Sequence, residues 1–246
     1  MQIPKSENFR LPFVKKEKAA DRTYKFYFNR TKKDFRFLPG QYIKISLPNS
    51  SSDNRGVSRY FTISSSPSES DYLMITTKIL RSTFKNDLFN LQTDEEVEFF
   101  GPLGKFVLDE DSKSPKLFLA GGIGLTPYRS MIKFSSDKKL ITPHILIASF
   151  KNESQILFRE EFEQIQKKNP NFKIIYTVTQ ENIGKKFLTN EVGRIDMDMI
   201  GRNCPYFKSC EIYVCGAFSF VSGIIAMLVN GGVAREKIKK ENFIGY

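Results

Sequence analysis

The stretch Lys116-Leu117-Phe118-Leu119-Ala120-Gly121-Gly122-Ile123-Gly124-Leu125-Thr126-Pro127 decides the fold of half of this chain. Its apolar run predicts a buried strand, and the glycines that follow predict a tight turn into a helix starting near Pro127. Glycine lets the backbone approach a pyrophosphate, and the N–H groups of a helix N-terminus point toward it. Because such a turn also occurs without any ligand, its surroundings decide between a structural turn and a nucleotide site.

The segments after this turn alternate between strand-like and helical patterns. Strands are predicted at His144–Phe150, Lys173–Thr179 and Glu211–Cys215, and helices at Ile156–Lys168 and Phe218–Asn230. This alternation predicts a parallel sheet with helices on both faces, the architecture of nucleotide-binding α/β domains. In this context the nucleotide interpretation of the glycine turn is favoured.

The first half of the chain has a different pattern, typical of an antiparallel barrel. Short β-rich runs are separated by turns such as Pro39-Gly40, and one helix is predicted near Thr83–Leu91. The runs are Thr23–Phe28, Gln41–Leu47 and Tyr72–Thr77. The pattern changes at a polar segment that ends at Ser112–Pro115, so we expect two domains, 1–112 and 113–246.

Charge and composition restrict the class of protein. The net charge is +11, and residues 5–36 hold eleven Lys or Arg against four acids. A solvated basic face and a docking surface for an acidic protein explain this equally well, whereas nucleic acid ranks last because no nucleic-acid motif accompanies the charge. The chain start lacks a secretory signal, and no apolar stretch could span a bilayer. We therefore expect a cytoplasmic monomer without membrane insertion.

The metal-ligating residue types do not form a metal-binding pattern. Cys204, Cys210 and Cys215 lack a CxxC pair and a fourth ligand. The single histidine, His144, begins an apolar strand and is expected to be structural. We predict no resident metal.

A second candidate segment lies in the first half. Arg59-Tyr60-Phe61-Thr62-Ile63-Ser64-Ser65 combines a cation, an aromatic face and a run of hydroxyls, which suits a flavin with its phosphates. Ser82-Thr83-Phe84-Lys85 has the pattern of a first helical turn, where hydroxyls, N–H groups and a lysine suit a phosphate. Packing in a barrel wall is the alternative explanation for either segment taken alone.

With these segments in order, the chain resembles the ferredoxin–NADP reductase superfamily over essentially its whole length. The matching motifs are Phe37–Tyr42 (F-x-P-G-Q-Y/F), Arg59–Thr62 (R-x-Y/F-S/T), Ser82–Phe84, Gly101–Gly104 (G-P-x-G), Gly121–Pro127 (G-G-x-G-x-T-P), Val214–Ala217 (C-G-x) and Glu241–Phe243 (E-x-aromatic). The resemblance implies a Greek-key β-barrel that binds FAD and a Rossmann-like parallel α/β domain that binds NADPH or NADH.

The resemblance also implies which residues bind the cofactors. Arg59 would contact the FAD pyrophosphate, and Phe61 would lie against the flavin ring. The FAD site would further include Tyr60, Thr62, Thr76, Lys78, Ser82, Thr83 and Phe84. The nicotinamide nucleotide would be held by Gly122, Gly124, Thr126, Pro127, Cys215 and Gly216. Phe243 and Tyr246 are both candidates for stacking on the flavin, because this chain continues beyond the aromatic that ends plant-type members.

Three residues would take part in catalysis if the resemblance holds. Thr62 would place its hydroxyl near flavin N5, Cys215 would lie near nicotinamide C4, and Glu241 would hydrogen-bond toward Thr62 and relay a proton. A solvated tail carboxylate is the alternative for Glu241, and a buried strand-end thiol is the alternative for Cys215. Phe61 stands where the family often has tyrosine, so one hydroxyl contact is absent here.

The sequence therefore predicts an FAD-dependent NAD(P)H oxidoreductase that passes electrons to an acidic carrier such as ferredoxin or flavodoxin. A flavin reductase acting on a ferric chelate or quinone, and a non-catalytic nucleotide-binding subunit, are the alternatives. The coenzyme is open on these residues. Lys151, Lys185 and Lys186 favour NADPH, whereas Glu153 and Glu181, with Gln180 where plant-type members tend to carry Arg, favour NADH.

Overall fold

The chain divides into two compact units in a computed structural model, which describes residues 4–47, 56–80, 82–180 and 191–243. The first unit comprises residues 1–108 together with 126–134, and the second comprises 109–125 together with 135–246. The division at residue 112 into separately folding domains stays a prediction.

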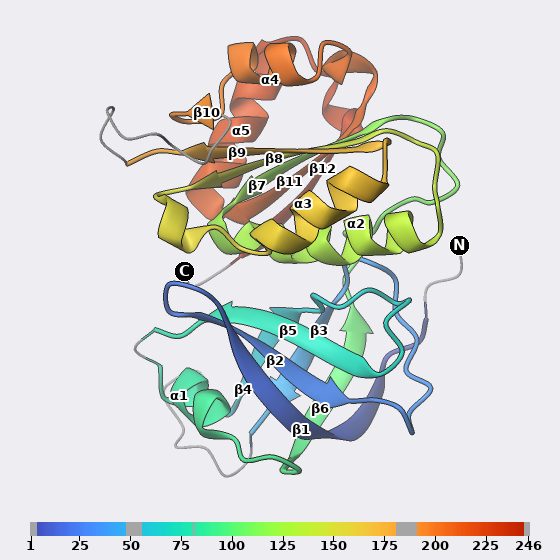
Figure 1. Cartoon of the computed structure of the whole chain (residues 1–246), viewed down its shortest axis with the longest axis vertical. Helices are drawn as coiled ribbons and strands as arrows, with labels where there is room; N and C mark the ends of the chain where they lie inside the picture. Colours follow the sequence, from blue (N-terminus) through green and yellow to red (C-terminus); the bar gives the residue numbers. More distant parts are fainter. Residues whose placement is uncertain (1–3, 48–55, 81, 181–190, 244–246) are drawn as a thin grey trace. The chain divides into compact units, whose positions relative to one another are not determined.

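The first unit contains a six-stranded antiparallel sheet, ordered β4-β3-β6-β1-β2-β5 (Figure 1). Its strands are β1 (Glu7–Ala20), β2 (Thr23–Asn29), β3 (Tyr42–Ser46), β4 (Ser58–Thr62), β5 (Tyr72–Lys78) and β6 (Glu96–Leu103). An antiparallel bridge between Ile63 and Ile75 joins the end of β4 to β5, the two edges of this sheet. This closure confirms the predicted barrel.

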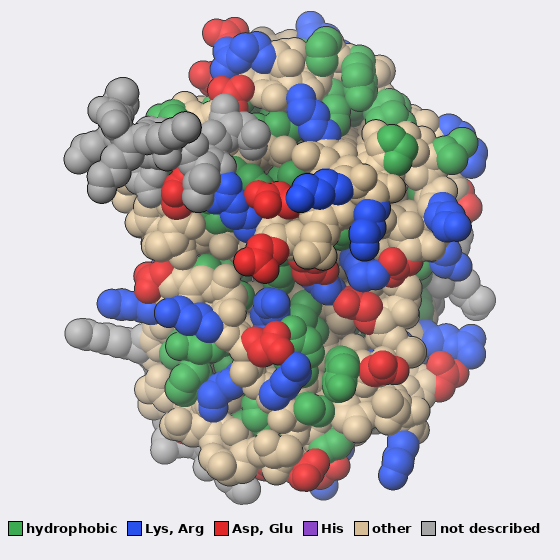
Figure 2. Space-filling model, viewed as in Figure 1, with side chains coloured by type: hydrophobic (Ala, Val, Ile, Leu, Met, Phe, Trp, Pro, Cys, Tyr) green, Lys and Arg blue, Asp and Glu red, His purple; other side chains and the backbone are tan. Residues whose placement is uncertain are grey.

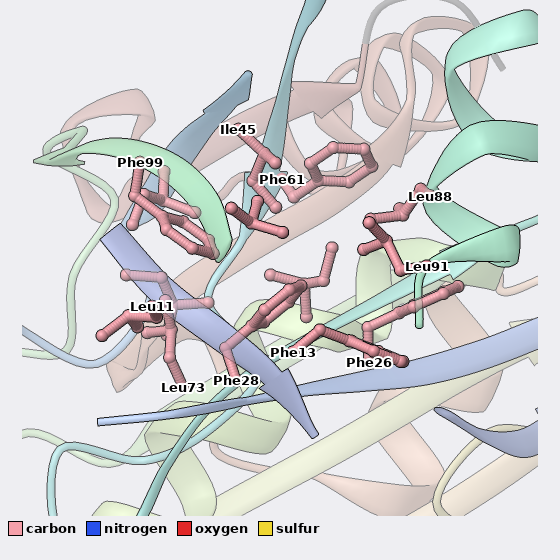
Figure 3. Packing of buried hydrophobic residues seen from close by; sticks show 14 of the residues in the cluster. Leu11, Phe13, Phe26, Phe28, Ile45, Phe61, Leu73, Leu88, Leu91 and Phe99 are labelled. Atoms are coloured by element: carbon pink, nitrogen blue, oxygen red, sulfur yellow. The ribbon is translucent and has the colours of Figure 1, made fainter. Parts of the chain in front are cut away.

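A phenylalanine-rich core fills this barrel. Inward positions on several strands carry Phe13, Phe26, Phe28 and Phe99, each at most 3% exposed, and Figure 3 shows their rings converging. Helix α1 (Thr83–Asn90) contributes its buried face to the same cluster. The alternation of apolar and polar residues along the strands places one face in this core, as a period of two requires.

Strand β1 is the main element that the sequence patterns did not single out. Its first half pairs with β6 and its second half with β2, with a register irregularity after Phe13. The outer face carries charges such as Lys16 and Lys18, and only Leu11 and Phe13 are buried. A strand with so few apolar positions gives a weak periodic signal, and its pairing partners stabilise it.

The second unit is a parallel six-stranded sheet, ordered β10-β9-β8-β7-β11-β12, which confirms the predicted α/β class. Its strands are β7 (Lys116–Gly121), β8 (His144–Phe150), β9 (Phe172–Val178), β10 (Glu191–Val192), β11 (Glu211–Ala217) and β12 (Ile238–Phe243). The chain starts at central β7, moves outward through β8 to β10, and returns to the other side of β7 with β11. Ligands of open α/β sheets bind at such a reversal, at the carboxyl ends of the strands.

Helices cover both faces of this parallel sheet (Figure 1). Helices α4 (Met197–Asn203) and α5 (Phe218–Asn230) share a buried cluster with β7 and β11, and α3 (Arg159–Lys168) packs on the opposite face. Helix α4 was not among the predicted helices, because only Met199 and Ile200 of its short span are buried. No helix within the described ranges is long and apolar enough to cross a lipid bilayer.

The single histidine lies inside the second unit, as predicted for a structural residue. His144 is 2% exposed, its Nδ1 donates to the carbonyl of Thr142 at 2.6 Å, and its ring stacks on Phe118 with centroids 5.7 Å apart. Burial lowers the pKa of His144 to about 4. The imidazole therefore stays neutral in the folded protein at pH values where the unfolded chain takes up a proton.

We expect His144 to make the protein acid-labile. The stabilising contribution of the neutral imidazole is fully present above the unfolded pKa near 6.5 and is lost as the pH falls toward 4. By pH 5 the loss amounts to about 2 kcal/mol. Urea unfolding at pH 7 and pH 5 measures this loss, and His144→Gln should show a smaller loss. NMR of the only imidazole should detect no titration above pH 5, and a titration near 6.5 would contradict the burial argument.

Candidate functional site

The glycine turn lies at the reversal of the parallel sheet. Strand β7 ends at Gly121, a 3₁₀ turn spans Gly122–Leu125, and helix α2 runs over Thr126–Asp137. The helix thus begins at Thr126, one residue before the predicted start, because the 3₁₀ turn leads directly into it. Thr126 is buried, with 1% of its surface exposed.

The close approach of this turn to the end of β11 requires glycine. A Cβ on Gly124 would lie 2.3 Å from the carbonyl oxygen of Cys215 and 2.7 Å from the Cα of Gly216, and both are backbone atoms. Gly122 has φ +54° and open space where a side chain would project. The second unit therefore brings Gly124 against Cys215 and Gly216, while nothing lies within 4 Å of a Cβ added at Gly122, so this backbone is open to a close approach.

Strand β12 adds the two tail residues of the predicted site. In the parallel register, Glu241 lies beside Cys215 and Phe243 beside Ala217. Cys215 is completely buried, and this burial, with the nearby Glu241 carboxylate, raises the pKa of its thiol well above the ordinary value. Burial also raises the pKa of Glu241. A neutral thiol thus lies beside a carboxyl group that holds its proton more tightly than a solvated one.

In the first unit, β4 presents its motif residues on two faces. Arg59 and Phe61 share one face: the Arg59 guanidinium lies 5.3 Å from the ring of Phe84, and the Phe61 ring stacks on it at 5.9 Å. Tyr60 and Thr62 share the other face, where Tyr60 is 64% exposed. Phe61 is 4% exposed, so the exposed aromatic ring of this motif is Tyr60.

The start of helix α1 lies beside the Arg59 face. Ser82 is the N-cap, and its hydroxyl accepts from the backbone N–H of Lys85 at 3.5 Å. The Lys85 ammonium donates to the carbonyl of Lys78 at 3.0 Å. The Lys85 ammonium, the Arg59 guanidinium and the first N–H groups of α1 therefore lie in one region. This arrangement fits the diphosphate of FAD.

Buried hydroxyls give a second test of the flavin site. The hydroxyls of Ser64 and Thr76 are buried and have no hydrogen-bond partner among the described residues. Their positions alternate with the core residues Ile63 and Ile75, so they lie on the face that Tyr60 and Thr62 share. Buried polar groups are usually paired, so two unpaired hydroxyls on one face fit a polar ligand such as the flavin ring. Ser64 lies in the predicted flavin segment Arg59–Ser65, although the sequence assigned it no individual role.

We expect Thr76→Val to have opposite effects on the apoprotein and on FAD binding. Removing an unpaired buried hydroxyl should stabilise the apoprotein by up to about 1 kcal/mol, while the lost hydrogen bond should weaken FAD binding about fivefold to tenfold. Thermal unfolding without FAD and fluorescence titration with FAD measure the two effects.

Thr23→Val is the matched control, because the buried hydroxyl of Thr23 donates to the carbonyl of Asp21 at 3.0 Å. This variant should lose about 1 kcal/mol of stability and bind FAD normally. Unchanged FAD affinity in Thr76→Val would remove Thr76 from the site.

Some predicted residues bear on the site less directly. Tyr246, Glu181, Lys185 and Lys186 lie outside the described residues. At the carboxyl ends of β8 and β9, the backbone N–H of Gln180 donates to the carbonyl of exposed Lys151 at 2.9 Å.

The described part of the chain holds no cluster of three or more metal-ligating side chains. The sulfur atoms of Cys204 and Cys210 lie 3.7 Å apart and are buried.

Comparison with known proteins identifies both halves. The family model of the oxidoreductase FAD-binding domain matches residues 10–108, and that of the oxidoreductase NAD-binding domain matches residues 118–225. The glycine betaine monooxygenase reductase subunit of Pseudomonas aeruginosa is 28% identical over 213 residues, covering 85% of this chain and 57% of that protein. The chain spans about half the length of the curated relatives it matches.

Solved structures share the same fold. A cytochrome P450 reductase from Amycolatopsis superposes with a TM-score of 0.82 at 18% identity, covering 97% of this chain and 70% of that one. The ferredoxin–NADP+ reductase of Plasmodium falciparum superposes with a TM-score of 0.78 at 20% identity, covering 96% of each chain.

Proposed function

Because the chain belongs to the ferredoxin–NADP reductase superfamily of FAD- and NAD(P)-dependent oxidoreductases, we propose that it moves electrons between NAD(P)H and an acidic carrier protein. We propose ferredoxin or flavodoxin as this electron carrier. The residue assignment rests on two groups of residues, which we call half-sites. In the nucleotide half-site, the glycine turn lies against Cys215, and in the flavin half-site, the β4 face carries buried hydroxyls without a partner among the described residues.

Each half-site residue has a proposed part in the reaction. Arg59, Ser82 and Thr83 bind the FAD phosphates, and Thr62, Ser64 and Thr76 offer hydroxyls to the flavin ring. The backbone of Gly122–Leu125 and the start of α2 bind the pyrophosphate of the nicotinamide nucleotide. Binding and orienting the two nucleotides is the main contribution that a protein makes to such a transfer.

The catalytic assignments concern Thr62, Cys215 and Glu241. FAD, when bound, supplies the chemistry that connects a two-electron donor, the nicotinamide nucleotide, with acceptors that take one electron at a time. The neutral, buried Cys215 thiol offers an uncharged surface to the nicotinamide ring, and Glu241, whose pKa burial raises, lies beside it as the proposed proton relay. Thr62 orients the flavin through its hydroxyl. Of the aromatic residues, Tyr60 and Phe243 are our candidates for ring stacking, and the flavin contact of Phe61 stays a prediction.

An acidic protein acceptor is supported by charge and by the relatives' names. The net charge is +11, and the compared proteins are named as reductases of a monooxygenase, a cytochrome P450 and ferredoxin. Several bases in residues 5–36 already form ion pairs. Arg10 pairs with Glu98, Lys33 with Glu7 and Arg36 with Asp34, while Lys15 and Lys25 share the single charge of Glu17.

Lys5, Lys18, Arg22 and Lys32 have no acidic partner in the described structure, and they fall into two groups at opposite ends of β1. We assign the carrier contact to one of these two groups: Lys5 with Lys32, or Lys18 with Arg22. Figure 2 shows blue and red side chains interspersed over one face of the molecule. Acids beside the basic side chains reduce the charge that would attract an acidic carrier. This favours a second candidate function, in which the acceptor is a small molecule such as a ferric chelate or a quinone.

Anaerobic titration tests the central proposal. Purified protein is loaded with FAD and titrated with NADPH and separately with NADH, while the flavin absorption is followed. Bleaching by one nucleotide supports the proposal and identifies the coenzyme. Bound flavin that neither nucleotide reduces would refute the assignment of the nucleotide half-site.

Salt dependence separates the two classes of acceptor. Carrier reduction should weaken about tenfold as ionic strength rises from roughly 20 to 200 mM, because exposed-charge docking is screened. Ferricyanide reduction in the same solutions corrects for salt effects on the nucleotide step. Carrier reduction that shows no salt dependence, or no carrier reduction at all, would favour the small acceptor.

A further inference from the structure

A buried ion pair in the first unit is used by none of the roles assigned above. Arg129, in helix α2, is 6% exposed, and its two terminal nitrogens contact the two carboxylate oxygens of Glu69, one of them at 2.8 Å. The same guanidinium donates to the carbonyl of Ser64 at 2.9 Å. The neighbouring Ser130 hydroxyl donates to the carbonyl of Ser65 at 2.7 Å.

These contacts fix both ends of one short loop. The loop, residues 64–69, begins two positions after Thr62, and Glu69 at its far end also accepts from the backbone N–H of Ser66 at 2.6 Å. Burial alone would raise the pKa of Glu69, but the hydrogen bonds and charge of Arg129 outweigh it and lower that pKa. Glu69 therefore stays ionised, and the two-point contact with Arg129 stays intact at neutral pH.

The arginine side of this ion pair lies at the start of helix α2, which is part of the nucleotide motif. Arg129 lies on the first turn of α2, whose first two residues, Thr126 and Pro127, belong to the predicted nucleotide site. Residues 126–134 pack with the first unit. One guanidinium thus holds the nucleotide-binding helix start to the loop that follows Thr62.

We propose that Arg129, held by Glu69, is a positioning residue that sets the distance between the nucleotide-binding start of α2 and the flavin-orienting segment at Thr62. The proposal rests on the proposed function. A two-nitrogen guanidinium–carboxylate contact fixes both distance and angle, whereas a lysine fixes only a charge. Since electron-pair transfer between stacked rings depends steeply on their geometry, loosening this contact slows the transfer itself more than it weakens nucleotide binding.

The test is single-turnover reduction of the FAD-loaded full chain by saturating NADPH or NADH under anaerobic conditions. Arg129→Met and Arg129→Lys should each lower the limiting rate about tenfold to a hundredfold, with the nucleotide dissociation constant changed less than about threefold. Glu69→Gln, which keeps the volume of the side chain, should lower the rate in the same direction and provides the measurement if Arg129→Met does not fold.

Arg202→Met is the matched control, because it removes another arginine–glutamate contact, that of Arg202 with Glu191 at 3.1 Å, and neither of these residues has a role in the proposed sites. It should reduce at the wild-type rate. Wild-type rates in Arg129→Lys and Glu69→Gln would overturn the positioning role while leaving the proposed function standing. A lower nucleotide affinity with an unchanged limiting rate would also overturn it, and a wild-type protein that is not reduced at all refutes both proposals.

Discussion

Replacing Gly124 by alanine is expected to lower the rate of flavin reduction by NAD(P)H at least about a hundredfold. The added Cβ would lie 2.3 Å from the carbonyl oxygen of Cys215, and no flexible side chain can move aside because the contact atoms are backbone. Either the 3₁₀ turn or the end of β11 must shift. Each carries part of the nucleotide half-site, so the reacting ring loses its position.

Stopped-flow reduction of the FAD-loaded protein measures this effect, and FAD affinity should stay close to wild type because the flavin residues belong to the other unit. Gly223→Ala is the matched control: it lies within α5, and nothing stands within 4 Å of an added Cβ. That variant should keep the wild-type rate and gain about 0.5–1 kcal/mol from helix propensity. A normal rate in Gly124→Ala would mean that the turn does not bind the nucleotide.

Replacing Glu211 by glutamine is expected to lower the free energy of unfolding by about 3 kcal/mol. The carboxylate lies 3.5 Å from the ammonium of Lys116, which is 1% exposed, and 2.9 Å from that of Lys239. Lys116 also donates to the Ser112 hydroxyl at 2.9 Å and to the Ser114 carbonyl at 2.7 Å. These two acceptors satisfy its hydrogen bonds but carry no negative charge that would balance the ammonium. Losing Glu211 leaves a buried cation without its nearest counter-charge.

Urea unfolding of three variants identifies the cause. Lys239→Met removes the more exposed partner of Glu211 and should cost only about 1 kcal/mol. Glu211→Gln combined with Lys116→Met should recover most of the loss, because it removes the buried charge along with its partner. If the double variant is no more stable than Glu211→Gln, packing around Glu211 is the cause instead of the uncompensated charge.

The fold class could be predicted from sequence because its signals are local. The apolar run before Gly121 and the strand at His144–Phe150 are continuous apolar runs, the helix at Phe218–Asn230 is a long apolar segment, and the structure contains all three at these positions. Strand β1 and helix α4 gave little signal, since each buries few apolar residues. Their formation depends on pairing and packing with distant segments, which no local window contains.

The sequence by itself determined the type of chemistry: a glycine turn after a buried strand, a β4 motif with cation and hydroxyl, and a Cys-Gly pair, in one order along the chain. Only the tertiary structure decided how these residues are used. It placed Phe61 in the core and Tyr60 outside, left the Ser64 and Thr76 hydroxyls buried and without a partner among the described residues, and joined Arg129 to Glu69. The physical reason is that side-chain direction and long-range pairing depend on the closed barrel and the packed sheet, whereas glycine turns and apolar periodicity are properties of the local chain.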